Sequence, residues 1–380
     1  MKKINIIGDI FGMTGYALHT RFLANALHEI GFDVRIETQK NPQWERYVND
    51  FELNAITKKF DNDCTTIMIG QPQSWPIGLA KKSKHFYGFL VWEGDKIPSD
   101  WINYISDERI DGIFVPSTHV KKAVLKSCKY KHIMRDYTPA APVITMDAGL
   151  FLKNKIHIVS HGYDPTKIFP LNIKHKKFSF IANKGWSQGM SDRGGIQFAI
   201  KAFANEFSKK ENVCLKIKIN TSYNPPGWNL EAELKKLNLP KNRPMIYTVT
   251  SMLNDKAMNK FYNDGDIFIS TSMAEGFNLP CLEAMGCNLC VIATNFGGQT
   301  DFVNKNNGYL LTKGKLGHYS KEISYEDVYW KKPNISEIQK TMRHCFTHQK
   351  EVKMKAEKAF VTASRLTWRQ TAKTIKKLIC

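Results

Sequence analysis

The stretch that decides the fold is residues 267–285, which read IFISTSMAEGFNLPCLEAM. Its opening Ile-Phe-Ile-Ser is a largely β-branched and aromatic run after a turn-like Asn-Asp-Gly-Asp, which predicts a short buried strand. Pro280 suits the first turn of a helix because no N–H donor is needed there. Asn288 tolerates the left-handed angles at which helices often end, and residues 291–294 are again strand-like. The stretch therefore predicts a strand, a loop, a helix and a second strand.

The loop and helix start of this stretch predict an anion site. Backbone N–H groups and the positive end of a helix dipole favour an anion such as a diphosphate. The residues expected to line this site are Gly276, Phe277, Asn278 and Leu279. Glu275 and Glu283 flank it, and carboxylates are suited to accepting hydrogen bonds from sugar hydroxyls. Together these groups indicate a pocket for a nucleotide sugar.

The spacing of the two acids carries a family resemblance. Glu275-x7-Glu283, set in Ser-x2-Glu-Gly-Phe-x-Leu-Pro-x-Leu-Glu-Ala-Met, resembles the donor motif of retaining GT-B glycosyltransferases, specifically glycosyltransferase family 4 of the group 1 type. The resemblance implies an α/β fold of two doubly wound Rossmann-like domains that face a cleft. It also implies metal-independent transfer of a sugar from a nucleotide diphosphate to a hydroxyl, with retained anomeric configuration. An ordinary strand–helix unit with surface glutamates is the alternative.

Length and composition agree with two globular domains. A chain of 380 residues favours two domains, and 42% hydrophobic residues allow each to bury a core. No apolar run approaches the roughly 20 residues of a membrane span. The apolar run after Lys3 is too short for a signal peptide and is interrupted by Asp9. We therefore expect a cytoplasmic protein, either free or peripheral at the inner membrane face.

The domain boundaries are set by a linker motif. Residues 161–170, His-Gly-Tyr-Asp-x4-Phe-Pro, resemble the linker of the same family. We expect an N-terminal acceptor-side domain at 1–165 and a C-terminal nucleotide-sugar domain at 171–355. The last segment, 356–380, is expected to be a helix that packs back on the first domain.

The net charge of +20 indicates anionic partners. Nucleotide-sugar donors, an acidic membrane surface and nucleic acid all fit, and a lysine-rich solvated surface is the alternative. Cysteine spacing offers no convincing metal motif among the eight cysteines. The Asp-x-Asp pairs at 61–63 and 264–266 are interpreted as polar turns. We expect no metal and no cofactor besides the nucleotide-sugar co-substrate.

The N-terminal domain opens with a strand, a glycine loop and a helix. The loop lacks Gly-x-Gly-x2-Gly, so a dinucleotide site is rejected. The resemblance places Gly12, Thr14 and Gly15 near the donor phosphates, and a purely structural turn is the alternative.

The acceptor side departs from the family pattern at Glu93. Many members end the matching strand with a histidine beside the reacting sugar, whereas here Trp92 and Glu93 end it. Glu93 is a candidate to orient the acceptor or act as its base, and capping of the next helix is equally open. Residues 127–155 are expected to be an irregular loop or insertion that touches the acceptor.

The C-terminal domain supplies the cations. A cation at a helix N-terminus is unfavourable by about 0.3–1 kcal/mol, so Arg193 makes sense there if an anion binds beside it. The resemblance assigns Lys184 and Arg193 to the diphosphate, Glu283 to the ribose and Glu275 to the donor sugar. It also puts the base near Met252 and Leu253.

Two other functions stay open from the sequence. One is a glycosyltransferase acting on modified nucleic acid, in which the net charge grips DNA or RNA. The other is a non-catalytic module that binds nucleotide sugars.

Overall fold

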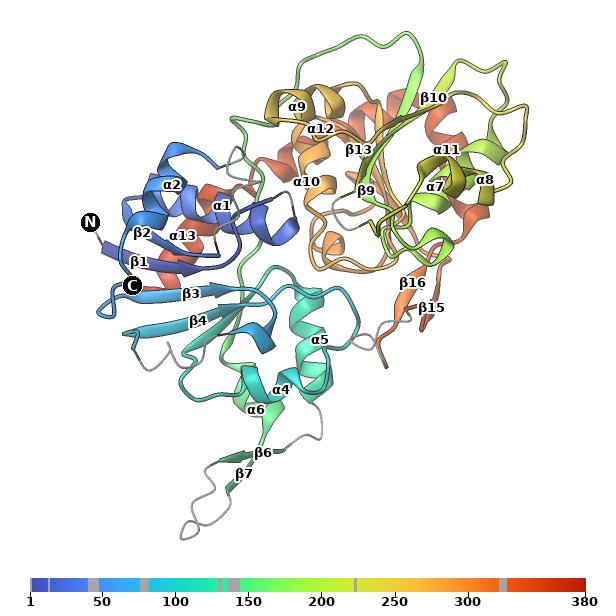
Figure 1. The fold of residues 1–380 in the computed structure, drawn as a ribbon. Helices are drawn as coiled ribbons and strands as arrows, with labels where there is room; N and C mark the ends of the chain where they lie inside the picture. The colour runs from blue at the N-terminus through green and yellow to red at the C-terminus, as the bar shows by residue number, and fades with distance from the viewer. Residues whose placement is uncertain are drawn as a thin grey trace. The chain divides into compact units, whose positions relative to one another are not determined.

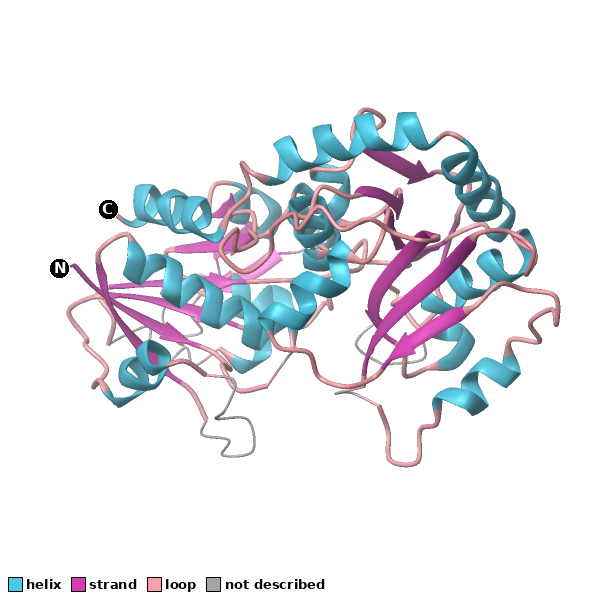
Figure 2. Cartoon of the chain, turned by 90° about the horizontal axis from the view of Figure 1, so that it is seen from above, coloured by secondary structure: helices cyan, strands magenta, loops and turns pink. Residues whose placement is uncertain are grey.

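The computed structural model describes residues 2–12, 14–39, 48–75, 82–128, 132–135, 144–221, 224–320 and 327–380 (Figure 1). The chain forms two compact units. Unit 1 comprises Met1–Gly162, Ile323–Val328 and Trp368–Cys380, and unit 2 comprises Tyr163–Glu322 and Tyr329–Thr367. Each unit is built on a six-stranded parallel sheet with helices packed against it (Figure 2).

The sheet of unit 1 has the strand order β2-β1-β3-β4-β5-β8. Its strands are β1 (Lys2–Ile7), β2 (Phe32–Glu37), β3 (Thr65–Ile69), β4 (His85–Phe89), β5 (Gly112–Val115) and β8 (Ile156–Ile158). Its helices are α1 (Gly15–Glu29), α2 (Asp50–Thr57), α4 (Trp101–Ile105), α5 (Thr118–Cys128), α6 (Ala148–Lys153) and α13 (Trp368–Ile379). The last helix, α13, packs on α1.

The sheet of unit 2 has the strand order β11-β10-β9-β12-β13-β14. Its strands are β9 (Phe178–Gly185), β10 (Val213–Asn220), β11 (Ile246–Val249), β12 (Ile267–Ser270), β13 (Cys290–Thr294) and β14 (Gly308–Leu311). Its helices are α7 (Ile196–Glu206), α8 (Leu230–Lys236), α9 (Asp255–Asn263), α10 (Leu279–Gly286), α11 (Ile335–Thr347) and α12 (Gln349–Ala363). A two-stranded ribbon joins β15 (Lys315–Gly317) to β16 (Trp330–Lys332).

Side chains that alternate along β9 show that the sheet of unit 2 is covered on both faces. Phe180 meets Phe203 of α7 and the following Phe207 edge to face or tilted. Ile181, which points to the opposite face, is buried with residues of α9, α10 and α12. The predicted α/β class with two doubly wound units is therefore confirmed.

The deciding stretch folds as a strand, loop and helix. All four residues of β12 are buried, and Pro280 lies in the first turn of α10. Asn288 follows the helix with a φ of 62°. Short apolar runs and punctuating residues thus predict this stretch correctly.

The prediction that residues 127–155 are irregular is wrong in two places. β6 (His132–Arg135) pairs with β7 (Ile144–Asp147) in an antiparallel ribbon. Asp147 then caps α6, and its side chain accepts a hydrogen bond from the backbone N–H of Leu150 at 2.8 Å. The strands have four residues each, too few for a clear alternation, but Asp147 before an apolar run was a usable cap signal.

The C-terminal segment expected at 356–380 is divided between the units. Residues up to Thr367 lie in unit 2, whereas Trp368–Cys380 lie in unit 1. No helix in the described ranges combines the length and apolar character needed to cross a membrane.

Candidate active site

The site lies where β9 and β12 of unit 2 end. These strands are parallel neighbours, so their carboxyl ends meet at one edge of the sheet. Lys184 is near the end of β9, and β12 ends at Ser270 before the loop that leads into α10. This edge is where doubly wound sheets bind ligands.

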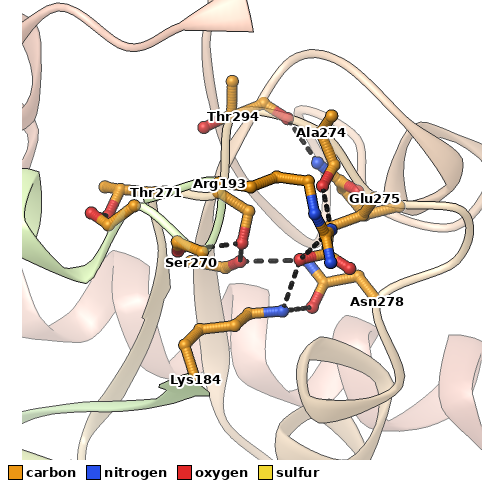
Figure 3. Close-up of polar contacts among 12 residues, drawn as sticks. Lys184, Arg193, Ser270, Thr271, Ala274, Glu275, Asn278 and Thr294 are labelled. Atoms are coloured by element: carbon orange, nitrogen blue, oxygen red, sulfur yellow. Dashed lines mark hydrogen bonds and ion pairs between the residues drawn. The ribbon is translucent and has the colours of Figure 1, made fainter. Parts of the chain in front are cut away.

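Two cations converge on Glu275 (Figure 3). The Nζ of Lys184 lies 2.9 Å from Oε1 of Glu275, and the nearer Nη1 of Arg193 lies 3.7 Å from the same oxygen. That Nη1 also donates to the carbonyl of Ala274 at 2.7 Å. Burial alone would raise the pKa of Glu275, but Lys184 and Arg193 hold this pKa below its usual range. Glu275 is therefore an ionised acceptor. The structure brings these three residues together, and their roles toward a donor stay predictions.

The side chain of Asn278 fixes the lysine (Figure 3). Its Oδ1 accepts from Nζ of Lys184 at 2.8 Å, and its Nδ2 donates to Oγ of Ser270 at 2.9 Å. Asn278 is buried and has a φ of 79°, in the left-handed region. Sequence reasoning assigned only backbone contacts to Asn278 and missed this side-chain role.

A second loop, residues 295–301, contacts the loop that carries Glu275. The backbone N–H of Gly298 donates to the carbonyl of Glu275 at 2.8 Å. A Cβ on Gly298 would lie 2.1 Å from the carbonyl oxygen of Gly276, so no larger residue fits there. The loop 295–301 thus sets the position of Glu275 through its main chain.

The helix start offers two of the backbone donors that the sequence predicts, and their contact with a ligand stays a prediction. Within the described residues, the N–H groups of Asn278 and Leu279 make no hydrogen bond to protein. The side chain of Phe277 is buried and packs on Phe302, with ring centroids 5.1 Å apart. Phe277 can therefore meet a ligand only through its main chain.

Glu283 is held by a residue that the sequence did not reveal. The hydroxyl of Tyr262 donates to Oε2 of Glu283 at 2.6 Å, and Nδ2 of Asn183 donates to that hydroxyl at 3.0 Å. Burial raises the pKa of Glu283 to about 7, against the opposing effect of the Tyr262 hydrogen bond. No local pattern links residues 79 apart in sequence, so Asn183 and Tyr262 could be found only from the fold.

Met252 and Leu253 lie in the turn between β11 and α9, and both are partly buried. Leu253 packs against the core of unit 2. Their contact with the base stays a prediction.

The remaining predicted residues belong to unit 1. Thr14 caps α1 by accepting from the N–H of Ala17 at 3.1 Å, next to Gly12 and Gly15. Glu93 follows β4, and its carbonyl accepts from Nε2 of His119 at 2.8 Å. Their roles toward the donor and acceptor stay predictions.

Three of the four carboxylates in the Asp-x-Asp pairs are engaged within the protein. Asp61 pairs with Lys3 at 2.8 Å, Asp264 pairs with Lys216 at 2.7 Å, and Asp266 accepts from the N–H of Ser179 at 2.8 Å. In the described part of the chain, no cluster of three or more His, Cys, Asp or Glu is arranged to hold a metal.

Residues 186–325 match the family described as Glycosyl transferases group 1. The resemblance to group 1 glycosyltransferases is confirmed for this segment. It contains Arg193, Glu275 and Glu283, so the predicted donor motif lies inside the matched region.

Other relatives align with both units of this chain, at low sequence identity. A probable sucrose-phosphate synthase of Thermosipho melanesiensis is 23% identical over 356 residues, which cover 80% of this chain and 79% of the relative. A glycosyltransferase from Rickettsia africae matches with a TM-score of 0.70 at 17% identity, covering 100% of this chain and 97% of that chain. Anabaena HepE in complex with UDP-glucose matches with a TM-score of 0.70 at 12% identity, covering 100% and 99%. These structures confirm the GT-B fold.

Proposed function

We propose that this protein is a retaining, metal-independent glycosyltransferase. It moves a sugar, of the hexosyl type, from a nucleotide-diphosphate sugar to the hydroxyl of a glycan, lipid-linked or surface-polysaccharide precursor. The observation that carries the proposal is the convergence of Lys184 and Arg193 on ionised Glu275 beside the start of α10.

Each group has a role in this reaction. Lys184, Arg193 and the N–H groups at the start of α10 stabilise the charge that develops on the leaving diphosphate. Removal of one preorganised donor of this kind typically lowers the rate roughly 10²–10³-fold. Glu275 accepts hydrogen bonds from hydroxyls of the donor sugar, and Glu283 accepts from the ribose.

The two cations also support independence from a metal. Lys184 and Arg193 have side chains that are 10% and 32% exposed, so their charges act in a partly dehydrated site. They can neutralise a diphosphate without Mg²⁺ or Mn²⁺. We expect transfer to continue in EDTA, and activity lost in EDTA and restored by Mn²⁺ would contradict this.

The nature of the relatives supports a nucleotide-sugar donor. The HepE structure contains UDP-glucose, and a pneumococcal O-GlcNAc transferase of similar fold contains UDP and GlcNAc. These ligands belong to those proteins, and they fit the donor class proposed here. Retention is tested by NMR assignment of the anomeric configuration in the first product.

The main test replaces the site residues. Glu275→Ala and Arg193→Ala should each lower transfer by roughly 10²-fold or more, because each removes a group that meets the donor. Arg243→Ala is the control, since Arg243 is an exposed arginine of unit 2 whose guanidinium donates to the carbonyl of Pro240. Circular dichroism should be unchanged in all three, which separates a loss of activity from a loss of fold. Wild-type turnover in the first two variants would reject the site.

A donor-hydrolysis assay distinguishes a glycosyltransferase from a non-catalytic binding module. An intact Glu275, Arg193 and Glu283 argue for catalysis, so slow hydrolysis of the donor should be detectable without any acceptor. Binding of sugar nucleotides without hydrolysis or transfer would favour the binding module.

A further inference from the structure

Lys218 of β10 is a buried lysine for which the described residues provide no acidic partner. The residue is 5% exposed, and within the described chain its Nζ donates only to the carbonyl of Ile219, at 3.3 Å. No described carboxylate forms an ion pair with it, and burial lowers its pKa. An uncompensated buried charge is costly, so a hydrogen-bond acceptor on a bound ligand would stabilise this ammonium group.

Lys216 provides the contrast within the same strand. It lies two residues earlier and therefore on the same face of the sheet. Its Nζ pairs with Oδ2 of Asp264 at 2.7 Å and also donates to the carbonyl of that residue at 2.8 Å. Asp264 ends α9, so this face of β10 looks toward α9. Lys218 faces the same way without such a carboxylate.

The register of the sheet places Lys218 at the ligand edge. Lys218 is opposite Asn183 of β9 and Val249, the last residue of β11. Asn183 bonds Tyr262, which in turn bonds Glu283, the proposed ribose contact. Beyond Val249 the chain enters the turn of Met252 and Leu253. Lys218 thus lies beside the place where a base attached to that ribose would extend.

We propose that Lys218 recognises the nucleobase of the donor by donating a hydrogen bond to the carbonyl at C4 of a pyrimidine or C6 of a purine. This inference rests on the proposed function. An ammonium group has donors only, so it favours a carbonyl at this edge of the base and disfavours an amino group. Uracil and guanine present a carbonyl there, whereas cytosine and adenine present an amino group. Donors built on UDP and GDP are therefore preferred over those built on CDP and ADP.

The test uses nucleotide pairs that differ in this exocyclic group and in the proton on the ring nitrogen beside it. Affinities for UDP against CDP, and for inosine diphosphate against ADP, are measured by calorimetry with the whole protein. The wild type should bind the carbonyl member of each pair at least roughly tenfold more tightly. Lys218→Met should weaken UDP binding roughly 10- to 100-fold, the range for a charge-assisted hydrogen bond, and level both ratios.

Lys216→Met is the matched control, because Lys216 shares the strand and face but has Asp264 as its partner. It should keep both ratios. Lys218→Met should unfold at the same temperature as the wild type or higher, since methionine fills a similar volume without a buried charge. In transfer assays, the Lys218→Met change should appear in KM for the donor more than in kcat.

Three outcomes separate this inference from the function on which it rests. Transfer activity with equal binding of UDP and CDP in the wild type would overturn the role of Lys218 alone. Affinity ratios that stay unchanged in Lys218→Met would also overturn the role of Lys218 alone. The lysine would then only stabilise the end of β10. A wild type that neither binds nor hydrolyses any sugar nucleotide would overturn both.

Discussion

At the scale of single residues, Asn278 combines a left-handed backbone conformation with side-chain hydrogen bonds that position Lys184. Left-handed angles are disfavoured for residues with a Cβ, and asparagine is among the few that adopt them. Glycine would be the conformationally easier choice at a φ of 79°, but it could not bridge Lys184 and Ser270. The side chain thus explains why asparagine stands at the helix start.

Asn278 therefore gives a prediction that separates backbone from side chain. Asn278→Gly keeps the backbone conformation and should lower kcat roughly tenfold, because Lys184 loses its anchor. Asn278→Ala should lower kcat similarly and also reduce the free energy of unfolding by about 1–2 kcal/mol relative to the glycine variant. Urea denaturation and steady-state kinetics measure the two effects. Equal stability of the two variants would show that the left-handed conformation is not maintained.

Glu283 gives a pH-dependent prediction. Its folded-state pKa of about 7 lies above the value of 4.5 for an exposed glutamate. Between these pH values the folded protein keeps a proton that the unfolded chain has released, so stability falls as pH rises. Relative to Glu283→Gln, the wild type should lose about 1–3 kcal/mol of unfolding free energy between pH 5 and pH 8. Urea denaturation of both proteins at the two pH values checks this, and a constant difference would contradict it.

The residues of the site differ in how far the sequence could predict them. Glu275, Lys184 and Arg193 stand beside predicted strand ends and helix starts, so topology alone brings them together. Tyr262 lies inside α9, where its spacing indicates only a buried helix face. Its hydroxyl reaches Glu283 because of how α9 and α10 pack, which no local pattern encodes.

At the scale of elements, the site depends on two loops that touch through their main chains. The loop after β12 carries Glu275, and the loop after β13 carries Gly297 and Gly298. Gly297 has a φ of 98°, and Gly298 lies against Gly276. The contact leaves no room for side chains, so it places Glu275 without any charged partner in the second loop.

Gly298→Ala tests this contact. The added Cβ would lie 2.1 Å from the carbonyl oxygen of Gly276 and 2.6 Å from Cα of Phe277, so the site loop must shift. We expect at least a tenfold loss of kcat/KM, since small displacements in a positioned site are costly. The unfolding free energy should fall by about 1–3 kcal/mol.

Gly185→Ala is the steric control, because its Cβ would meet its nearest neighbour, the carbonyl of Asn220, at an ordinary 3.5 Å. It should leave the unfolding free energy within about 0.5 kcal/mol of the wild type. A Gly298→Ala variant as stable and active as the wild type would show that the two loops do not set each other's position.

Elements were predictable where their patterns were long or punctuated. β12 and α10 follow from an apolar run and Pro280, whereas β6 and β7 have four residues each and pair only with one another. Such short strands gain their stability from pairing, so the sequence around residues 132–147 gave no periodicity to detect.

At the scale of the whole molecule, the last helix belongs to the first unit, although the strands of each sheet come from that unit's own stretch of chain. The chain passes from unit 1 to unit 2 after Gly162 and, apart from Ile323–Val328, which belong to unit 1, it returns to unit 1 at Trp368. Trp368 is buried against His19 and His161, with ring centroids 5.5 and 5.2 Å apart. A return of the last helix follows from family resemblance, but composition and periodicity alone do not give the residue at which it begins.

Net charge gives the last prediction. The +20 charge is a long-range property that salt screens, whereas Lys184 and Glu275 are partly buried and in direct contact. Between 50 and 300 mM NaCl, we therefore expect KM for the donor to change less than about threefold. Association with an anionic acceptor surface should weaken much more over the same range.

Comparison of probes then identifies which anionic surface matters. Vesicles with acidic lipids, duplex DNA and neutral oligosaccharides are each offered at several salt concentrations. For a glycan or lipid-linked acceptor, DNA should bind only weakly at physiological salt, as non-specific contacts do. Tight retention on DNA, with a steep salt slope and transfer to it, would instead select the nucleic-acid acceptor. The positive charge would then bind the phosphates of the nucleic acid, and the donor site in unit 2 would support the same sugar transfer to a nucleic-acid acceptor.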